Sequence, residues 1–328
     1  MGLNRGSFLL TASSVSSSPE LPAGSALDLI GETPLLSLDR IHPGPGRILA
    51  KAEFLQPGGS VKDRAAKAIL LAAIADGRLK PGMPVVEMTS GNMGAGLAVA
   101  CAALGHPLIV TMSAGNSVAR ARMLRALGAD VILVDQVEGR AGQVTGRDIE
   151  TAESVARQIA EERDGFYVDQ FNASEGTAAH EQGTAQEILR QSGVRIDGWV
   201  AAVGTGATFM GVARALNAAN PATVCAAVEP ARSRPLANEV VAEPAHLIQG
   251  TGYGFVPPQW DPTLMDLSIG VSDKETAHWR QKLGAVEGLY VGFSAAANVC
   301  AAVRLLSSGL VKSDGVIATV LCDTGLKY

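Results

Sequence analysis

The chain has 328 residues, of which 47% are hydrophobic and 18% are charged, and its formal net charge is −5. This length and composition predict a globular protein with room for two domains, and they exclude a disordered chain. The sequence has no basic tract and no apolar run of membrane-spanning length. We therefore expect neither nucleic acid nor a membrane as a partner.

The reactive residue types are scattered along the chain. The four cysteines lie far apart, which favours buried thiols in a reducing compartment over a disulfide framework. No two of the five histidines lie within one helical turn, so we expect no metal site. Residues 1–22 are rich in Ser and Gly, and we expect them to form a flexible tail without a signal peptide, on a cytoplasmic protein.

Strand-like and helical segments alternate along most of the chain, and this alternation is typical of a parallel, doubly wound sheet. A first block ends with a helix near residue 163, and a second begins near residue 165. The predicted strands cover residues 47–54, 84–87, 107–112, 131–134, 199–203, 224–228 and 316–321. The predicted helices cover residues 62–76, 95–104, 117–127, 148–163, 178–191, 209–219, 273–287 and 295–307. We expect residues 229–260 to be irregular and assign no role to residues 135–147.

A lysine stands at the start of the first predicted helix. Lys62 follows Gly58 and Gly59, and Ser60 and Asp63 have the spacing of a capping box. The positive end of a helix dipole disfavours a cation there, so the neutral amine of Lys62 becomes more accessible. Such an amine is a nucleophile towards carbonyl groups. The alternative is a solvated lysine on a surface helix.

A glycine-containing loop follows the predicted strand over residues 199–203. Backbone N–H groups at such a strand–loop–helix junction form a site for an anion, and the threonine hydroxyls add donors. The spacing matches neither a nucleoside-triphosphate loop nor a dinucleotide fingerprint, so a single phosphate monoester fits best. An ordinary tight turn is the alternative. The loop consists of Gly204, Thr205, Gly206, Ala207 and Thr208.

Other polar segments stand before or at helix starts. Thr89, Ser90 and Asn92 offer hydroxyl and amide donors to a carboxylate or a ring oxygen, and Ser294 stands near another helix start. Each alone is also explained as a capped helix. Residues 170–172 and the glycine-rich residues 250–254 are weaker signals. A nucleophilic lysine, a phosphate loop and a carboxylate loop together predict pyridoxal 5'-phosphate as the cofactor.

In these motifs the chain resembles the cysteine synthase family of fold-type II pyridoxal-phosphate enzymes, which includes close relatives of cystathionine β-synthase. The likeness runs from Gly31-Glu32-Thr33-Pro34-Leu35 to the last six residues, 323–328. It implies two doubly wound α/β domains, as in the tryptophan synthase β subunit, with the cofactor in the cleft between them. We expect a smaller, mobile domain over residues 45–165 and a larger one over 23–44 plus 166–328. A homodimer is the family expectation.

The resemblance also implies roles for individual residues. Lys62 would form the Schiff base with the cofactor and act as the catalytic base, Asn92 would contact the ring 3-oxygen, and Ser294 would face the pyridine nitrogen. The loop Gly204–Thr208 would hold the phosphate. The residues expected to contact the substrate are Thr89, Ser90, Gly91, Met93, Gln170, Gly252 and Tyr253.

The implied reaction is β-substitution on a serine-derived amino acid through an aminoacrylate, with sulfide, another thiol or an amine as nucleophile. A serine at the ring nitrogen is a neutral partner, which suits expulsion of a β-leaving group. Met88, Met93 and Tyr253 depart from the common family pattern and indicate an unusual donor or nucleophile.

Three alternatives remain open from the sequence. The first is β-elimination that releases a keto acid and ammonia, and the second is a non-catalytic homologue that binds pyridoxal phosphate or a partner. The third, a nucleotide-binding dehydrogenase, is disfavoured because the dinucleotide fingerprint is missing.

Overall fold

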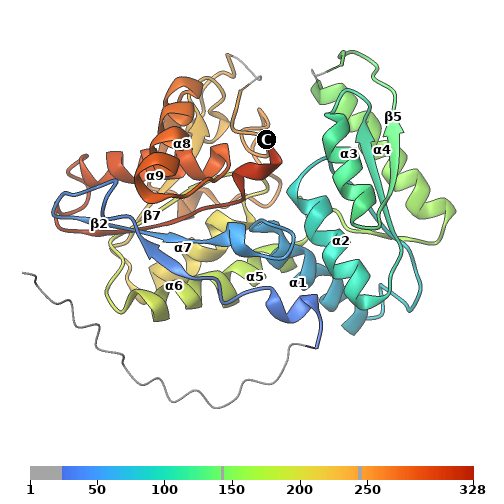
Figure 1. Cartoon of the computed structure of the whole chain (residues 1–328), viewed down its shortest axis with the longest axis horizontal. Coiled ribbons are helices and arrows are strands. Elements are labelled where there is room, and N and C mark those ends of the chain that lie inside the picture. Colours follow the sequence, from blue (N-terminus) through green and yellow to red (C-terminus); the bar gives the residue numbers. More distant parts are fainter. Residues whose placement is uncertain (1–23, 142–143, 243–245) are drawn as a thin grey trace, which may run out of the picture.

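The computed structural model describes residues 24–141, 144–242 and 246–328, so the tail predicted for residues 1–22 lies outside the described residues. In this part of the chain the strands form a six-stranded and a four-stranded sheet, and helices flank both. Figure 1 shows two lobes, with α2, α3, α4 and β5 in one and β2, β7, α8 and α9 in the other. The predicted α/β class is confirmed.

The larger sheet has the order β1-β2-β10-β7-β8-β9 and is parallel except for β1, which pairs antiparallel with β2. Its strands are β1 (Leu35–Ser37), β2 (Arg47–Lys51), β7 (Gly198–Ala202), β8 (Val224–Pro230), β9 (Leu267–Val271) and β10 (Val316–Val320). Strand β2 falls in the range predicted for the smaller domain, yet it pairs with β1 and β10 in this sheet. The smaller sheet therefore starts only with β3.

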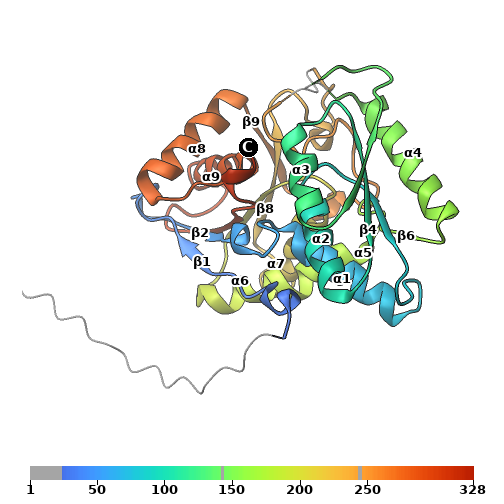
Figure 2. The ribbon, with the colours of Figure 1, turned by 45° about the vertical axis from the view of Figure 1, so that its right-hand side comes forward.

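The smaller sheet has the order β5-β4-β3-β6 and is entirely parallel. Its strands are β3 (Val85–Met88), β4 (Leu108–Ser113), β5 (Asp130–Val134) and β6 (Phe166–Tyr167). Apolar residues on successive strand positions point to opposite faces, so Val85 packs under α1 and α2 whereas Val86 packs under α4. Figure 2 shows α4 on the outer face of this sheet and α2 and α3 on the other.

The same alternation builds the core of the larger lobe. Ile48 and Val200 pack with α8 and α9, whereas Trp199 and Ala201 pack with α6 and α7 on the opposite face. Both faces of the parallel strands are buried, which explains their nearly continuous apolar sequences. The helices are α1 (Lys62–Ala75), α2 (Asn92–Leu104), α3 (Val118–Ala126), α4 (Gly146–Glu162), α5 (Ser174–Ala179), α6 (Ala185–Ser192), α7 (Ala207–Ala219), α8 (Asp273–Glu287) and α9 (Phe293–Leu306).

Several boundaries differ from the prediction. The strand predicted over 47–54 ends at Lys51, and a 3-10 turn follows at Glu53–Leu55. The single helix predicted over 178–191 is instead α5, a π-helical turn at His180–Thr184 and α6. The sequence prediction missed β1, β6 and β9, which are short and half-buried or lie at a sheet edge. No helix among the described residues is both long enough and apolar enough to cross a membrane.

Candidate active site

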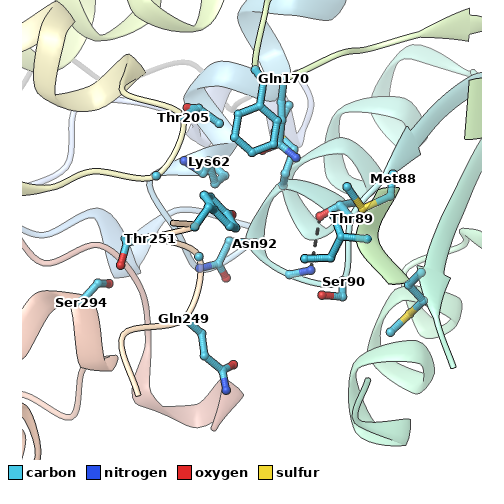
Figure 3. Close-up of a pocket in the computed structure, with 18 of the residues that line it drawn as sticks. Lys62, Met88, Thr89, Ser90, Asn92, Gln170, Thr205, Gln249, Thr251 and Ser294 are labelled. Atoms are coloured by element: carbon cyan, nitrogen blue, oxygen red, sulfur yellow. Dashed lines mark hydrogen bonds between the residues drawn. The ribbon is translucent and has the colours of Figure 1, made fainter. Parts of the chain in front are cut away.

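A cavity of about 900 Å³ is lined by loops from both lobes. These loops follow the carboxyl ends of β3 and β7, which is where ligands bind in open parallel sheets. Every residue that the sequence predicts for the site lines this cavity except Gly252. In Figure 3, Thr251 and Ser294 lie on one side of Lys62, and Thr89 and Ser90 lie on the other.

Lys62 is the first residue of α1, as predicted, and its side chain is partly buried. Burial lowers the pKa of its ammonium group, although the neighbouring Cys322 and Asp323 oppose the shift. The predicted capping box is wrong, because Val61 is the N-cap residue and makes no side-chain cap. The Asp63 carboxylate turns back instead and accepts a hydrogen bond from the Gly58 N–H. Lys62 thus has the position and the lowered pKa of a nucleophilic amine.

The glycine loop forms a cradle at the start of α7. Gly206 has a φ of 91°, a conformation that favours glycine, and α7 begins directly after it at Ala207. A Cβ on Gly204 would lie 2.3 Å from the Gly250 carbonyl oxygen, so no larger residue fits there. The first N–H groups of α7 have no acceptor within the helix and lie at the positive end of its dipole. The cradle therefore suits a phosphate group.

Two residues behind the cradle were not singled out from the sequence. His180 is buried, and its Nε2 lies 3.1 Å from Thr208 Oγ1 while its Nδ1 lies 2.9 Å from Thr184 Oγ1. Burial lowers the pKa of His180 to about 3, so the ring is neutral and holds the Thr208 hydroxyl. Trp260 lies on the other side, with Cε3 3.5 Å from where a Cβ on Gly206 would stand. Neither residue belongs to a recognisable sequence motif, so only the folded structure shows that both lie beside the cradle.

The loop between β3 and α2 supplies hydroxyl groups. Thr89 Oγ1 accepts a hydrogen bond from the Gly91 N–H at 3.3 Å, and Ser90 is partly open to the cavity. Gln170 lies nearby, because its Nε2 donates to Glu87 Oε1 at 2.9 Å. The loop precedes the N-terminus of α2, so its donors and the helix dipole together suit a carboxylate.

Asn92 is the first residue of α2, which begins three residues earlier than predicted. Its Nδ2 donates to Asp323 Oδ2 at 2.8 Å, and its Oδ1 accepts from Lys327 Nζ at 2.7 Å. Two residues near the end of the chain, Lys327 in a 3-10 turn and Asp323 before that turn, thus hold the amide that lines the cavity. The sequence prediction did not include these partners.

Ser294 lies in the first turn of α9, which begins at Phe293. Burial raises the pKa of the neighbouring Cys322 thiol to about 12, although the Ser294 hydroxyl opposes the shift. The group near Ser294 is therefore a neutral thiol at physiological pH. A neutral hydroxyl and a neutral thiol would not stabilise the protonated form of a ring nitrogen placed against them.

Two of the predicted substrate residues are placed differently from the expectation. Gly252 does not line the cavity, and its carbonyl accepts a hydrogen bond from Ser233 Oγ. Met93 lines the cavity but is only 2% exposed, because its side chain packs into the core under the four-stranded sheet. Cavity-lining residues that the sequence prediction did not single out are Asn116, Arg120, Gln249 and Phe255.

The comparisons with known proteins agree with this geometry. A family model described as pyridoxal-phosphate dependent enzyme matches residues 26–323. The chain belongs to this family. Its cofactor is pyridoxal 5'-phosphate, and the residues present fit that group, because Gly206 and the start of α7 form an anion cradle and Lys62 lies in the same cavity.

Several relatives cover nearly the whole chain. A probable cysteine synthase of Bacillus subtilis is 36% identical over 306 residues, which is 92% of this chain and 94% of that protein. An O-ureido-L-serine synthase of Streptomyces lavendulae is 35% identical and covers 93% of this chain and 90% of its own length. The crystal structure of an O-acetylserine-dependent cystathionine β-synthase from Helicobacter pylori superimposes with a TM-score of 0.83, at 30% identity, over 94% of this chain and 98% of that chain. These similarities place the chain among the cysteine synthase-like, fold-type II members of the family.

Proposed function

We propose that this chain catalyses β-substitution on an O-activated L-serine, with sulfide, a thiol or an amine as the nucleophile. The observation that carries the proposal is the partly buried Lys62, which lines the same cavity as the glycine cradle and the Thr89 loop. Relatives named cysteine synthase and O-ureido-L-serine synthase support it. Pyridoxal phosphate supplies an aldehyde that captures an amine and a ring that accepts an electron pair from the substrate α-carbon.

The protein residues position the substrate and move protons. Thr89, Ser90 and the N-terminus of α2 bind the substrate carboxylate, and Gln170 closes that side of the cavity. Burial lowers the pKa of the Lys62 ammonium group, which favours the neutral amine, and the Nζ of that amine can accept the proton from the substrate α-carbon. The cradle before α7 would anchor the phosphate and so hold the cofactor in place relative to Lys62.

The covalent site is tested on the holoenzyme. Borohydride reduction followed by peptide mass spectrometry should place a pyridoxyl group on the Lys62 peptide. Lys62→Ala should lose this modification and about 10²–10⁴-fold or more of its β-substitution rate. Lys67→Ala is the control, since Lys67 lies in the same helix and its Nζ donates to the Leu27 carbonyl at 2.8 Å. A pyridoxyl group found on another lysine would show that Lys62 is not the attachment site.

The reaction type is tested with O-acetylserine, O-phosphoserine, serine and cysteine as donors. Keto-acid release is measured with and without sulfide. The proposal predicts that an O-activated serine is consumed with sulfide to give a substituted amino acid, with little keto acid. Keto-acid release that does not respond to the nucleophile would identify β-elimination instead. A holoenzyme spectrum unchanged by every amino acid would indicate a non-catalytic homologue.

We further propose that the protein acts as a cytoplasmic homodimer, as the family leads us to expect. Three of the four free cysteines are buried, which suits a reducing compartment. We also propose that the smaller lobe moves as a unit to close the cavity, with its boundary shifted so that β2 belongs to the larger lobe. Light scattering coupled to size-exclusion chromatography measures the oligomeric state, and a monomer would contradict the proposed homodimer.

A further inference from the structure

Three aromatic residues meet on one side of the cavity, and we call Phe171, Tyr253 and Phe255 the aromatic wall. The ring centroids of Tyr253 and Phe255 lie 5.8 Å apart with an interplanar angle of 20°. The ring centroid of Phe171 lies 5.4 Å from that of Tyr253, in an edge-on contact, and 5.8 Å from that of Phe255, in a tilted one. Aromatic residues make up only 4% of the chain, so three of them in one contact group are not a simple result of composition.

The wall is directed towards the cavity and not into a core. Tyr253 is 40% exposed and Phe255 is 49% exposed, and both line the cavity. None of the three residues belongs to the hydrophobic core clusters of the described chain. Exposed aromatic faces that gather at a concave surface mark a site for an apolar ligand.

The wall begins beside the glycine cradle. A Cβ on Gly204 would lie 3.8 Å from a ring carbon of Tyr253, so this ring lies close to the first glycine of the cradle. Phe171 is held from the other side, since Gln259 Nε2 donates to its carbonyl oxygen at 2.9 Å. A group that enters along the wall therefore arrives beside the cradle, in the cavity that Lys62 also lines.

Polar side chains also line the cavity beside the wall, among them Gln170, Asn172 and Glu153. Arg120 and Gln249 line the cavity, and they are hydrogen-bonded to each other. Tyr253 contributes a neutral hydroxyl, because a phenol keeps its proton at neutral pH. The exposed carboxylate of Glu150 also lines the cavity. The wall offers a stacking surface to an aromatic ring, whereas hydrogen sulfide has no ring to place against it.

Resting on the proposed β-substitution, we propose that the nucleophile of this enzyme is a thiol or an amine that carries an aromatic ring, bound against the aromatic wall. The bond from the β-carbon of the donor to oxygen breaks first, as the α-proton passes to Lys62. The sulfur or nitrogen of the nucleophile then forms a bond to that carbon, and the α-carbon regains a proton. The oxygen leaves with the electron pair, and the proton of the nucleophile goes to the leaving group or to water. The step needs no oxidant or reductant.

The test compares two thiols of similar size on the holoenzyme with O-acetylserine as donor. Phenylmethanethiol should react with a higher kcat/KM than cyclohexylmethanethiol, because only the first can stack on the wall. Phe255→Leu keeps an apolar side chain but removes a ring, and it should reduce this preference about 3- to 10-fold. Val256→Ala is the matched control, since Val256 is exposed in the same loop but does not line the cavity.

A binding measurement separates this proposal from the proposed reaction. Calorimetric titration with benzyl alcohol, which cannot react, should show saturable binding that Phe255→Leu weakens about 3- to 10-fold and Val256→Ala leaves unchanged. Equal rates with the two thiols, or benzyl alcohol binding that does not depend on Phe255, would overturn the aromatic nucleophile. The enzyme could instead show no β-substitution while benzyl alcohol still binds in a manner that depends on Phe255. That result would contradict the proposed reaction and support the aromatic site.

Discussion

Glu87 is a buried carboxyl that organises one side of the substrate cavity. Its Oε1 accepts a hydrogen bond from Gln170 at 2.9 Å, and its Oε2 accepts one from the Asp169 N–H at 3.0 Å. Burial raises the pKa of Glu87 to about 8, although these two hydrogen bonds oppose the shift. Glu87 is therefore protonated at neutral pH and loses its proton as the pH rises through about 8.

This titration predicts a pH dependence of stability. The unfolded chain releases the Glu87 proton near its ordinary pKa of 4.5, whereas the folded chain keeps it up to about pH 8. The stabilisation that Glu87 gives the folded protein is therefore complete below pH 4.5 and is lost as the pH rises to 8. Between pH 5.5 and 8.5 it lowers the unfolding free energy by about 3 kcal/mol. In Glu87→Gln, which keeps an acceptor for Gln170 but does not titrate, this loss should disappear.

Urea unfolding of both proteins at the two pH values measures the difference. Glu150→Gln serves as a control, because Glu150 is exposed on the same cavity and should behave like the natural protein. Parallel pH profiles for Glu87→Gln and the natural protein would show that Glu87 does not titrate in this range.

At the scale of residues, the sequence predicted the site residues whose chemistry depends on their place at the start of a helix. Lys62 and the glycine loop stand at helix starts, where a short pattern carries the dipole and the free N–H groups. It could not predict His180, Glu87 or Asp323, because their partners lie far away in the sequence. Only the folded chain brings His180 to Thr208 and Asp323 to Asn92.

At the scale of elements, α7 packs closely against the segment that contains α5 and the π-helical turn. A Cβ on Gly211 would lie 2.4 Å from the Thr177 carbonyl oxygen and 2.8 Å from the Glu181 nitrogen. Both atoms belong to the backbone, so neither can move without shifting a helix. This contact holds α7 and its cradle in place relative to His180.

A pair of glycine substitutions tests this packing. Gly211→Ala should lower the unfolding free energy by about 1–3 kcal/mol, because the overlap outweighs the higher helix propensity of alanine. Gly284→Ala in α8 is the control, since a Cβ there meets nothing within 4 Å. It should stabilise the protein by about 0.5–1 kcal/mol. Thermal unfolding of both variants measures the contrast, and equal shifts would show that α7 has room to move.

Element boundaries were harder to predict than element types. Helices α2, α7 and α9 each begin earlier than predicted, at Asn92, Ala207 and Phe293. Glycine-containing loops look non-helical in sequence, yet their last residues already belong to the helix and face the cavity. The π-helical turn left no signal either, because its residues are ordinary helix positions apart from one extra residue in the turn.

At the scale of the whole molecule, a buried ionic cluster joins segments that are distant in sequence. Arg64 of α1 pairs with Glu53 at 2.8 Å and with Glu187 of α6 at 2.6 Å. Lys51 of β2 also contacts Glu187 at 2.6 Å, and Glu53 accepts from Thr33 Oγ1 at 2.7 Å. The helix that carries Lys62 is thus fixed to the larger lobe by charges that are almost completely buried.

Removing one partner of this cluster should be costly. Glu187→Ala leaves Arg64 and Lys51 without their shared carboxylate, so the unfolding free energy should fall by about 3–5 kcal/mol. Arg190→Ala is the control, because its pair with Glu32 is exposed to solvent and contributes little to stability. Denaturant unfolding measures the free energy of unfolding of both variants. The pKa of Glu187 is lowered to about 2, so its contribution is complete above pH 4.5 and is lost as the pH falls towards 2.

Trp260 has a practical consequence for experiments on this protein. Its indole packs against Phe209 with centroids 5.3 Å apart and lies beside Gly206 of the cradle. Ultraviolet emission from an indole responds to what lies next to it, so entry of a phosphate-bearing molecule should alter the fluorescence of Trp260. The protein thus carries its own optical sensor, and loading of the cradle can be followed in solution without any added label.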